Sequence, residues 1–129
     1  MAAHPARLEI AVASYSGALQ IWDVDAKVLL NGRDFDASRL RPRCLAYDPN
    51  GNYLAVGFTS GTVKLLDPST LEDIATFKTC KDPILDLCFS GEGDYLAVAD
   101  ADHHVVLWQL EYRGGDADEL SASAAEEPP

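Results

Sequence analysis

The feature of this 129-residue chain that most constrains its fold is an internal repeat. Leu45–Leu66 reads LAYDPNGNYLAVGFTSGTVKLL, and Leu87–Trp108, which begins 42 positions later, reads LCFSGEGDYLAVADADHHVVLW. A third, partial copy, Ile10–Trp22, reads IAVASYSGALQIW and aligns with Leu54–Leu66 at an offset of 44. A period in the low forties, with short apolar runs in each unit, indicates a repeat architecture built of small sheets. Chains of this kind usually serve as binding surfaces rather than as catalysts.

The middle unit predicts a four-stranded antiparallel meander. Its apolar runs are short, rich in residues that favour strands, and separated by clusters of Gly, Pro, Asn and Asp. The turn Asp48–Gly51 combines a Pro, which presets φ, with an Asn-Gly pair, which supplies positive φ. The expected strands are Cys44–Tyr47, Tyr53–Gly57, Val63–Leu66 and Ile74–Phe77.

The other two units each predict three strands. In the last unit they are Ile84–Phe89, Tyr95–Ala99 and Val105–Leu110; in the first they lie near Leu8–Ala13, Leu19–Trp22 and Val28–Leu30. The first unit therefore lacks its opening strand. The runs Leu54–Val56 and Leu96–Val98 are apolar without clean alternation, which predicts central strands buried on both faces by stacked sheets.

Three motifs together resemble the WD-repeat proteins: Asp102–Trp108 (DHHVVLW), Gly17–Asp23 (GALQIWD) and the D-P-N-G turn. In that family each repeat of about 40–45 residues forms one four-stranded blade of a β-propeller. The resemblance spans about residues 8–110. It departs from the family in lacking the Gly-His dipeptide and in carrying Leu66 where the Trp is expected. The resemblance implies an all-β fold and a role in holding proteins together.

The predicted strands amount to about two and a half blades, whereas a closed propeller has four to eight. The units are about 8–42, 43–83 and 84–110, preceded by an N-terminal end over 1–7. Ten strands cannot close a ring, so the chain is a segment of a larger propeller, assembles with other copies, or keeps open ends. The missing opening strand of the first unit favours a larger propeller.

Charge excludes some partners and marks the C-terminal segment. The net charge of −11 argues against nucleic-acid binding, because a polyanion would be repelled. Residues 111–129 contain six acids and one Arg, and their composition predicts an acidic, disordered tail.

The remaining composition predicts a cytoplasmic chain that does not enter a membrane. No apolar run approaches the length of about 20 residues that a membrane helix requires, and the N-terminus lacks the apolar block of a secretory signal. Cys44, Cys80 and Cys88 have neither an even count nor metal-ligand spacing, which indicates reduced thiols.

The run Asp100–His104 contains side chains that bind metals, and it is the alternative basis for a metal-dependent enzyme acting through Asp102, His103 and His104. The repeat alignment places this run over Phe58–Thr62, an ordinary hairpin turn, so a structural role is preferred. No serine elbow, cysteine signature or phosphate-binding loop is present. We therefore expect no catalytic residue, metal site or cofactor.

The one basic cluster, Arg39, Arg41 and Arg43, lies between the first two units, where loops of such sheets present binding residues. It is either a solvated loop or a contact for an acidic partner, such as a tubulin-like tail or a neighbouring chain. The expected function is a non-catalytic protein-interaction scaffold within a larger assembly, whose partners are other proteins, further WD-repeat blades or other copies of the chain. Similarity to WD-repeat proteins of microtubules and cilia suggests a cytoskeletal or ciliary location. A truncated fragment without independent function is the remaining alternative.

Overall fold

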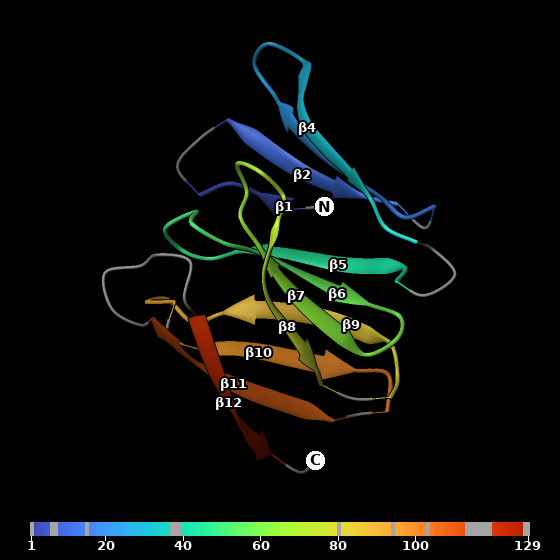
Figure 1. The fold of residues 1–129 in the computed structure, drawn as a ribbon. Helices are drawn as coiled ribbons and strands as arrows, with labels where there is room; N and C mark the ends of the chain where they lie inside the picture. Colours follow the sequence, from blue (N-terminus) through green and yellow to red (C-terminus); the bar gives the residue numbers. More distant parts are fainter. Residues whose placement is uncertain are drawn as a thin grey trace.

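The structure, a computed structural model, describes residues 2–5, 8–14, 16–36, 40–79, 81–93, 95–102, 104–112 and 120–127. Within these ranges every regular element is a β-strand, and the strands form three four-stranded antiparallel sheets stacked face to face (Figure 1). The described residues include no helix of the length and hydropathy needed to cross a membrane. The predicted all-β fold is confirmed.

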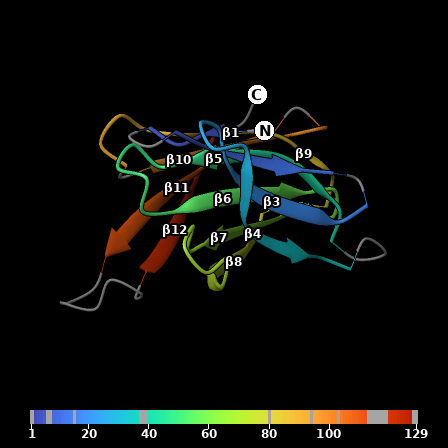
Figure 2. The same cartoon turned by 90° about the horizontal axis from the view of Figure 1, so that it is seen from above.

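Each sheet is one contiguous stretch of chain whose strands pair in sequence order. The first sheet comprises β1 (Ala2–Ala3), β2 (Glu9–Ala13), β3 (Ala18–Asp23) and β4 (Val28–Asp34). The second comprises β5 (Pro42–Tyr47), β6 (Leu54–Phe58), β7 (Thr62–Leu66) and β8 (Asp73–Lys78). The third comprises β9 (Ile84–Phe89), β10 (Tyr95–Asp100), β11 (Val105–Tyr112) and β12 (Leu120–Glu127). Viewed from above, β1, β5 and β9 lie along one side of the stack and β4, β8 and β12 along the other (Figure 2).

The sequence repeat is reproduced in the geometry of the turns. The backbone N–H of Gly51 donates to the carbonyl of Asp48 at 3.0 Å, and 42 positions later Gly93 donates to Ser90 at 2.9 Å. Both glycines have positive φ, +74° and +80°, a conformation in which a side chain is strained. The shared Gly of the two repeats is therefore the residue that allows the same hairpin to form twice.

The second sheet is buried on both faces, as its apolar runs predict. Leu54, Ala55 and Val56 are all fully buried in β6. Leu54 and Val56 belong to the core shared with the first sheet, and Ala55 belongs to the core shared with the third. Alternate residues of one central strand thus hold the three sheets together.

The first sheet has an opening strand that the sequence analysis missed. Ala2 pairs with Ala11 and Ala3 pairs with Ile10, so β1 completes the sheet within residues assigned to an N-terminal end. Two alanines carry no strand pattern, and only their position beside β2 identifies them. The first predicted unit is therefore a complete four-stranded blade.

The third sheet is also completed by a strand outside the predicted repeat region. β12 pairs along the whole of β11, from Val105 with Glu127 to Tyr112 with Leu120. This differs from the prediction of a disordered tail over residues 111–129, of which 113–119 and 128–129 lie outside the described residues. The strand forms because β11 has an open edge, whose backbone N–H and C=O groups pair with those of β12. This pairing outweighs the weak strand propensity of the β12 residues. The described residues thus hold three four-stranded sheets rather than two and a half.

Candidate interaction surfaces

The Asp/His run forms the turn between β10 and β11, and its first carboxylate organises that turn. Asp100 is buried, and its Oδ1 accepts hydrogen bonds from the backbone N–H groups of Asp102 at 3.0 Å and His104 at 2.9 Å. His104 Nδ1 lies 3.5 Å from Asp100 Oδ2 and 3.6 Å from Asp102 Oδ2. His103 lies outside the described residues.

This arrangement does not favour a metal centre. One oxygen of the Asp100 carboxylate, Oδ1, already accepts two backbone hydrogen bonds. Among the described residues, no three His, Cys, Asp or Glu side chains are grouped so that they could hold a metal ion. The two backbone hydrogen bonds give the carboxylate of Asp100 a structural role in the turn.

The predicted basic cluster lies where the chain enters the second sheet. Arg41 precedes β5 and Arg43 lies within it, and both are exposed. The carbonyl of Arg41 accepts a hydrogen bond from the N–H of Thr59 at 3.0 Å, which ties this segment to the β6–β7 turn. Arg39 lies outside the described residues.

Arg43 also lines a depression to which all three sheets contribute. Its other lining residues are Ala13 at the end of β2, Pro42 at the start of β5 and Leu85 in β9, and its volume is about 360 Å³. Leu85 is 45% exposed. The surface therefore combines a fixed positive charge with exposed apolar area, a combination that suits a protein segment carrying acidic and apolar side chains.

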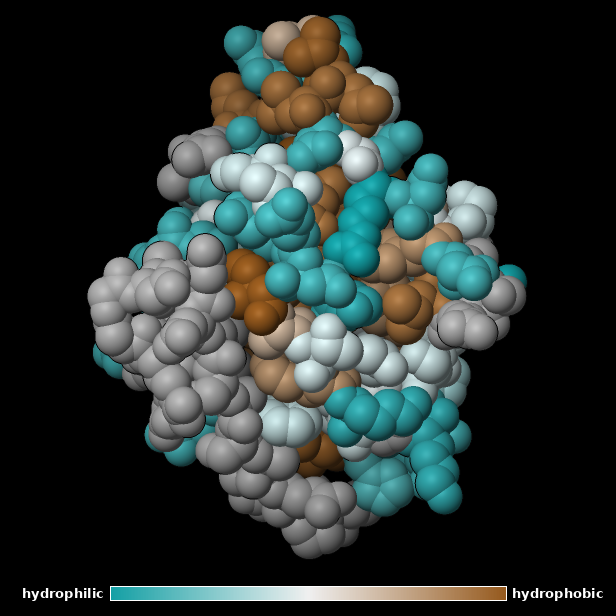
Figure 3. Space-filling model, viewed as in Figure 1, coloured by the Kyte–Doolittle hydropathy of each residue, from teal (hydrophilic) through white to brown (hydrophobic). Residues whose placement is uncertain are grey.

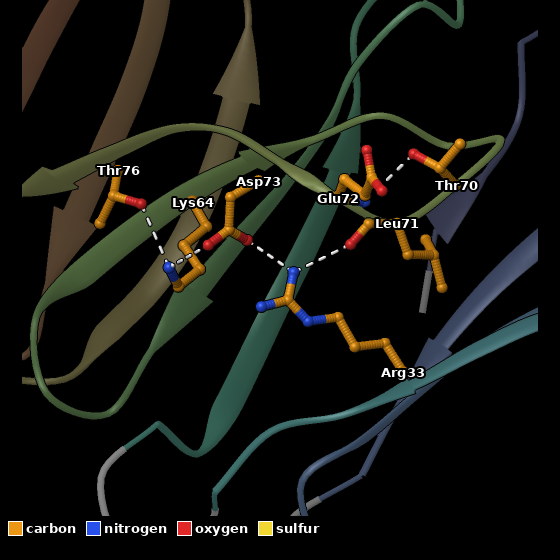
Figure 4. A network of polar contacts seen from close by, with 7 residues as sticks. All are labelled: Arg33, Lys64, Thr70, Leu71, Glu72, Asp73 and Thr76. Carbon is orange, nitrogen blue, oxygen red and sulfur yellow. Dashed lines mark hydrogen bonds and ion pairs between the residues drawn. The ribbon is translucent and has the colours of Figure 1, made fainter.

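A polar network clamps the outer part of the first sheet to the second (Figure 4). Arg33 of β4 reaches across the interface and donates from Nη1 to Asp73 Oδ1 at 2.5 Å and to the carbonyl of Leu71 at 2.9 Å. On the other side of Asp73, Lys64 Nζ donates to Oδ2 at 2.8 Å and to Thr76 Oγ1 at 3.1 Å. One carboxylate therefore joins two cations from different sheets.

Burial and charge act in opposite directions on Asp73. Partial burial raises the pKa of its carboxyl, but the hydrogen bonds from Arg33 and Lys64 outweigh this effect and hold the pKa below its usual value. Lys64 is nearly buried in β7, where an unpaired ammonium would be costly. This network is not predicted from the sequence; the feature that could have indicated it is a lysine among the apolar residues of the strand Thr62–Leu66.

Two outer faces of the stack carry exposed hydrophobic side chains. Hydrophobic residues gather at the end of the molecule formed by the first sheet (Figure 3), where Val28, Leu29 and Leu30 are each about half exposed. At the other end, Tyr95 is 38% and Val105 is 44% exposed. Exposed apolar surface of this kind indicates contact sites.

Two family models match the chain. The model of the anaphase-promoting complex subunit 4 WD40 domain matches residues 9–85, and the model of the WD domain, G-beta repeat, matches residues 71–109. The first match alone covers more than half of the chain and includes the first two sheets from β2 onward.

Curated relatives include proteins named for cilia and microtubules. Cilia- and flagella-associated protein 251 of Mus musculus is 38% identical over 114 residues, which is 87% of this chain and 9% of that protein. The protein of the same name from Chlamydomonas reinhardtii is 36% identical over 84% of this chain and 13% of its own length. Echinoderm microtubule-associated protein-like 2 of Homo sapiens is 28% identical over 88% of this chain and 17% of its own length. The chain thus spans less than a fifth of the length of these relatives.

The fold matches a solved structure over almost the whole chain. The β-propeller domain of Cps50 (Swd1) from Myceliophteria thermophila aligns with a TM-score of 0.77 at 18% identity. The alignment covers 97% of this chain and 43% of that domain. The three sheets therefore have the arrangement of neighbouring blades in part of a propeller.

Proposed function

The chain belongs to the WD-repeat family, and on this premise we propose that it is a non-catalytic scaffold that binds other proteins in a cilium or another microtubule-based structure. The names of the ciliary relatives, at up to 38% identity, support the location. The propeller fold supports the scaffold role, because blades present loops and edges rather than a catalytic constellation. The observation on which the proposal chiefly depends is the surface to which all three sheets contribute.

We propose that this surface binds an acidic segment of a partner protein. Arg41 and Arg43 are exposed cations on a chain whose overall charge is −11, so they provide a local positive site on an acidic molecule. Leu85 and Ala13 beside Arg43 would receive apolar side chains of the same segment. Acidic tails such as those of tubulin have the charge that this site would attract.

Binding to a synthetic poly-glutamate peptide tests this proposal. The double variant Arg41→Glu, Arg43→Glu should weaken binding about tenfold, since each exposed ion pair contributes up to about 1 kcal/mol. Wild-type binding should also weaken as salt rises, because exposed charges are screened. The control is Lys27→Glu in the exposed β3–β4 turn, which makes the same two-unit charge change as either single substitution, so the single variants Arg41→Glu and Arg43→Glu are measured beside it. Equal binding by the double variant and the control would contradict the proposed site.

The location is tested separately, in ciliated cells. A fluorescently tagged chain should concentrate in cilia, and cross-linking followed by mass spectrometry should join it to ciliary proteins. A uniform distribution through the cytoplasm would contradict a ciliary role. It would not bear on the peptide-binding site, which the poly-glutamate measurement tests.

A further inference from the structure

The contacts between sheets follow one rule. Each sheet has an N-side face, turned toward the preceding sheet, and a C-side face, turned toward the following one. The N-side faces that form the two cores consist of Leu54, Val56 and Leu66 in the second sheet and Leu96, Val98 and Trp108 in the third. The C-side faces that they meet consist of Ala11, Leu19 and Ile21 in the first sheet and Ala55, Val63 and Leu65 in the second.

The first sheet has an N-side face of the same type, and none of the described strands packs a sheet against it. At the repeat positions 44 before Leu54, Val56 and Leu66 stand Ile10, Val12 and Trp22. Their counterparts in the second sheet are 0% exposed, whereas these three are only partly buried. Leu29, which pairs with Trp22 across the strands, is 49% exposed and extends this face.

The third sheet has a matching C-side face, and within the described part of the chain no sheet lies against it. At the repeat positions 42 after Ala55, Val63 and Leu65 stand Ala97, Val105 and Leu107. Val63 is 0% exposed, but Val105 is 44% exposed. The register places these residues together, since Ala97 pairs with Leu107 and Val105 pairs with Ala99.

The spare N-side face and the spare C-side face are counterparts of two faces that already pack together in this structure. We infer that two copies of the chain associate head to tail, the third sheet of each against the first sheet of the other, and so close a ring of six sheets. Six lies within the four to eight blades of known propellers, whereas three copies would supply nine. Two such interfaces cover the spare N-side face and the spare C-side face of both copies. No spare face then remains, which is the condition for a closed assembly. The inference deepens the proposed scaffold function, because it names what completes the ring.

The charge of the chain modulates this association. An aspartate lies on each spare face. Asp34 pairs with Ala18, which is four positions before Trp22 in β3 and therefore on the same face. Asp86 pairs with Ala99, which is two positions after Ala97 in β10 and therefore on the same face. Each face otherwise consists mainly of apolar residues. Self-association should therefore strengthen as salt rises, because salt screens the repulsion between acidic copies, whereas peptide binding by the arginines should weaken.

Measurement of molar mass in solution tests the inference. The wild-type chain should have twice the 13.9 kDa mass of one chain. Val105→Asp and Leu29→Asp each place a charge on one exposed face and should halve the observed mass. Val24→Asp changes an equally exposed residue of the β3–β4 turn and should remain dimeric. A wild-type monomer, or a mass above that of a dimer, would overturn the closed ring.

Mixing the two variants distinguishes a head-to-tail contact from other dimers. A Val105→Asp chain keeps its N-side face intact and a Leu29→Asp chain keeps its C-side face intact, so an equimolar mixture should regain a dimer through one unaltered interface. Dissociation by only one of the two substitutions, or no recovery on mixing, would contradict the head-to-tail arrangement. Poly-glutamate binding is measured on the same variants. If the monomeric variants still bind the peptide, the proposed binding site is supported whether or not the ring forms.

Discussion

The indole of Trp108 in β11 is stacked on the ring of Phe77 in β8, with ring centroids 4.8 Å apart and an interplanar angle of 19°. The pair joins the second and third sheets, and Trp108 Nε1 also donates to Thr79 Oγ1 at 3.3 Å. Trp108 is the last residue of the Asp102–Trp108 motif that resembles the WD-repeat family. In this chain it acts as an inter-sheet contact.

Trp108→Ala should lower the free energy of unfolding by about 2 kcal/mol, somewhat less than for a fully buried Trp because this side chain is only half-buried. Trp108→Phe keeps an aromatic ring against Phe77 and loses the hydrogen bond, so its effect should be about 1 kcal/mol. Chemical denaturation measures both. Equal losses for the two variants would contradict a contribution from the stacked rings.

Gly57 in β6 should tolerate no side chain. A Cβ at this position would lie 2.6 Å from both Cys44 Sγ and Ile84 Cγ2, too close for either atom, so Gly57→Ala should cost about 1–3 kcal/mol of stability. The matched control is Gly91→Ala in an exposed turn, where a Cβ would meet nothing within 4 Å. A thermal melt in which both variants behave alike would show that the second and third sheets are not closely packed there.

Asp73→Asn should destabilise the chain by about 1 kcal/mol near neutral pH, because it removes two ion pairs and leaves Lys64 without a carboxylate. The neighbouring Glu72→Gln provides the control, because Glu72 is exposed and forms no ion pair with the residues that the structure describes. Denaturation curves at one pH and ionic strength compare them. A loss confined to the Glu72 variant would contradict the clamp.

The same network predicts a pH dependence. The folded-state pKa of Asp73 lies below its unfolded value of about 3.8, so its contribution is complete above that value and is lost as pH falls through the lower folded-state pKa. The difference in stability between wild type and Asp73→Asn should therefore be constant from about pH 5 to 7 and shrink as pH falls below the unfolded-state pKa. A difference that grows on acidification would contradict the lowered pKa.

Cys44 should be unreactive in the folded chain. Burial, with a smaller effect of Asp86, raises the pKa of its thiol to about 11, so little thiolate exists near neutral pH. Mass spectrometry after brief iodoacetamide treatment should find Cys44 unmodified in native protein and modified in denaturant. The experiment is repeated on the monomeric Val105→Asp chain, in which Cys88 is exposed and should be modified. Cys88 then serves as the internal standard for Cys44 in the same sample. Rapid native labelling of Cys44 would contradict its burial.

The sequence predicted the fold through features that are local. The central strands, the glycine turns and the burial of Leu54–Val56 follow from a repeated pattern, and the structure confirms them. β1 and β12 were missed because their formation depends on an available neighbouring edge and not on their own residues. A two-residue strand of alanine and an Ala/Ser/Glu strand have no pattern that distinguishes them from loops.

The candidate surfaces were predictable only in part. Arg41 lies in an exposed connection, as expected from the sequence, whereas Arg43 lies in β5 and is also exposed; the role of both in binding stays a prediction. The clamp of Arg33, Lys64 and Asp73 joins residues as far as 40 positions apart, and a single sequence does not show which charges meet across a sheet interface. The spare faces likewise depend on which members of each repeat position are buried and which are exposed, and a sequence alone does not show this.

Every strand pair in the described residues joins neighbours in sequence, and no sheet borrows a strand from another. A ribosome therefore releases each sheet in full before the next begins, and none must wait for a distant segment to be synthesised. Pairing between near neighbours also closes short loops, which favours fast folding. The newly made chain can thus fold in order from its N-terminus, and each folded sheet offers an apolar face against which the next sheet packs.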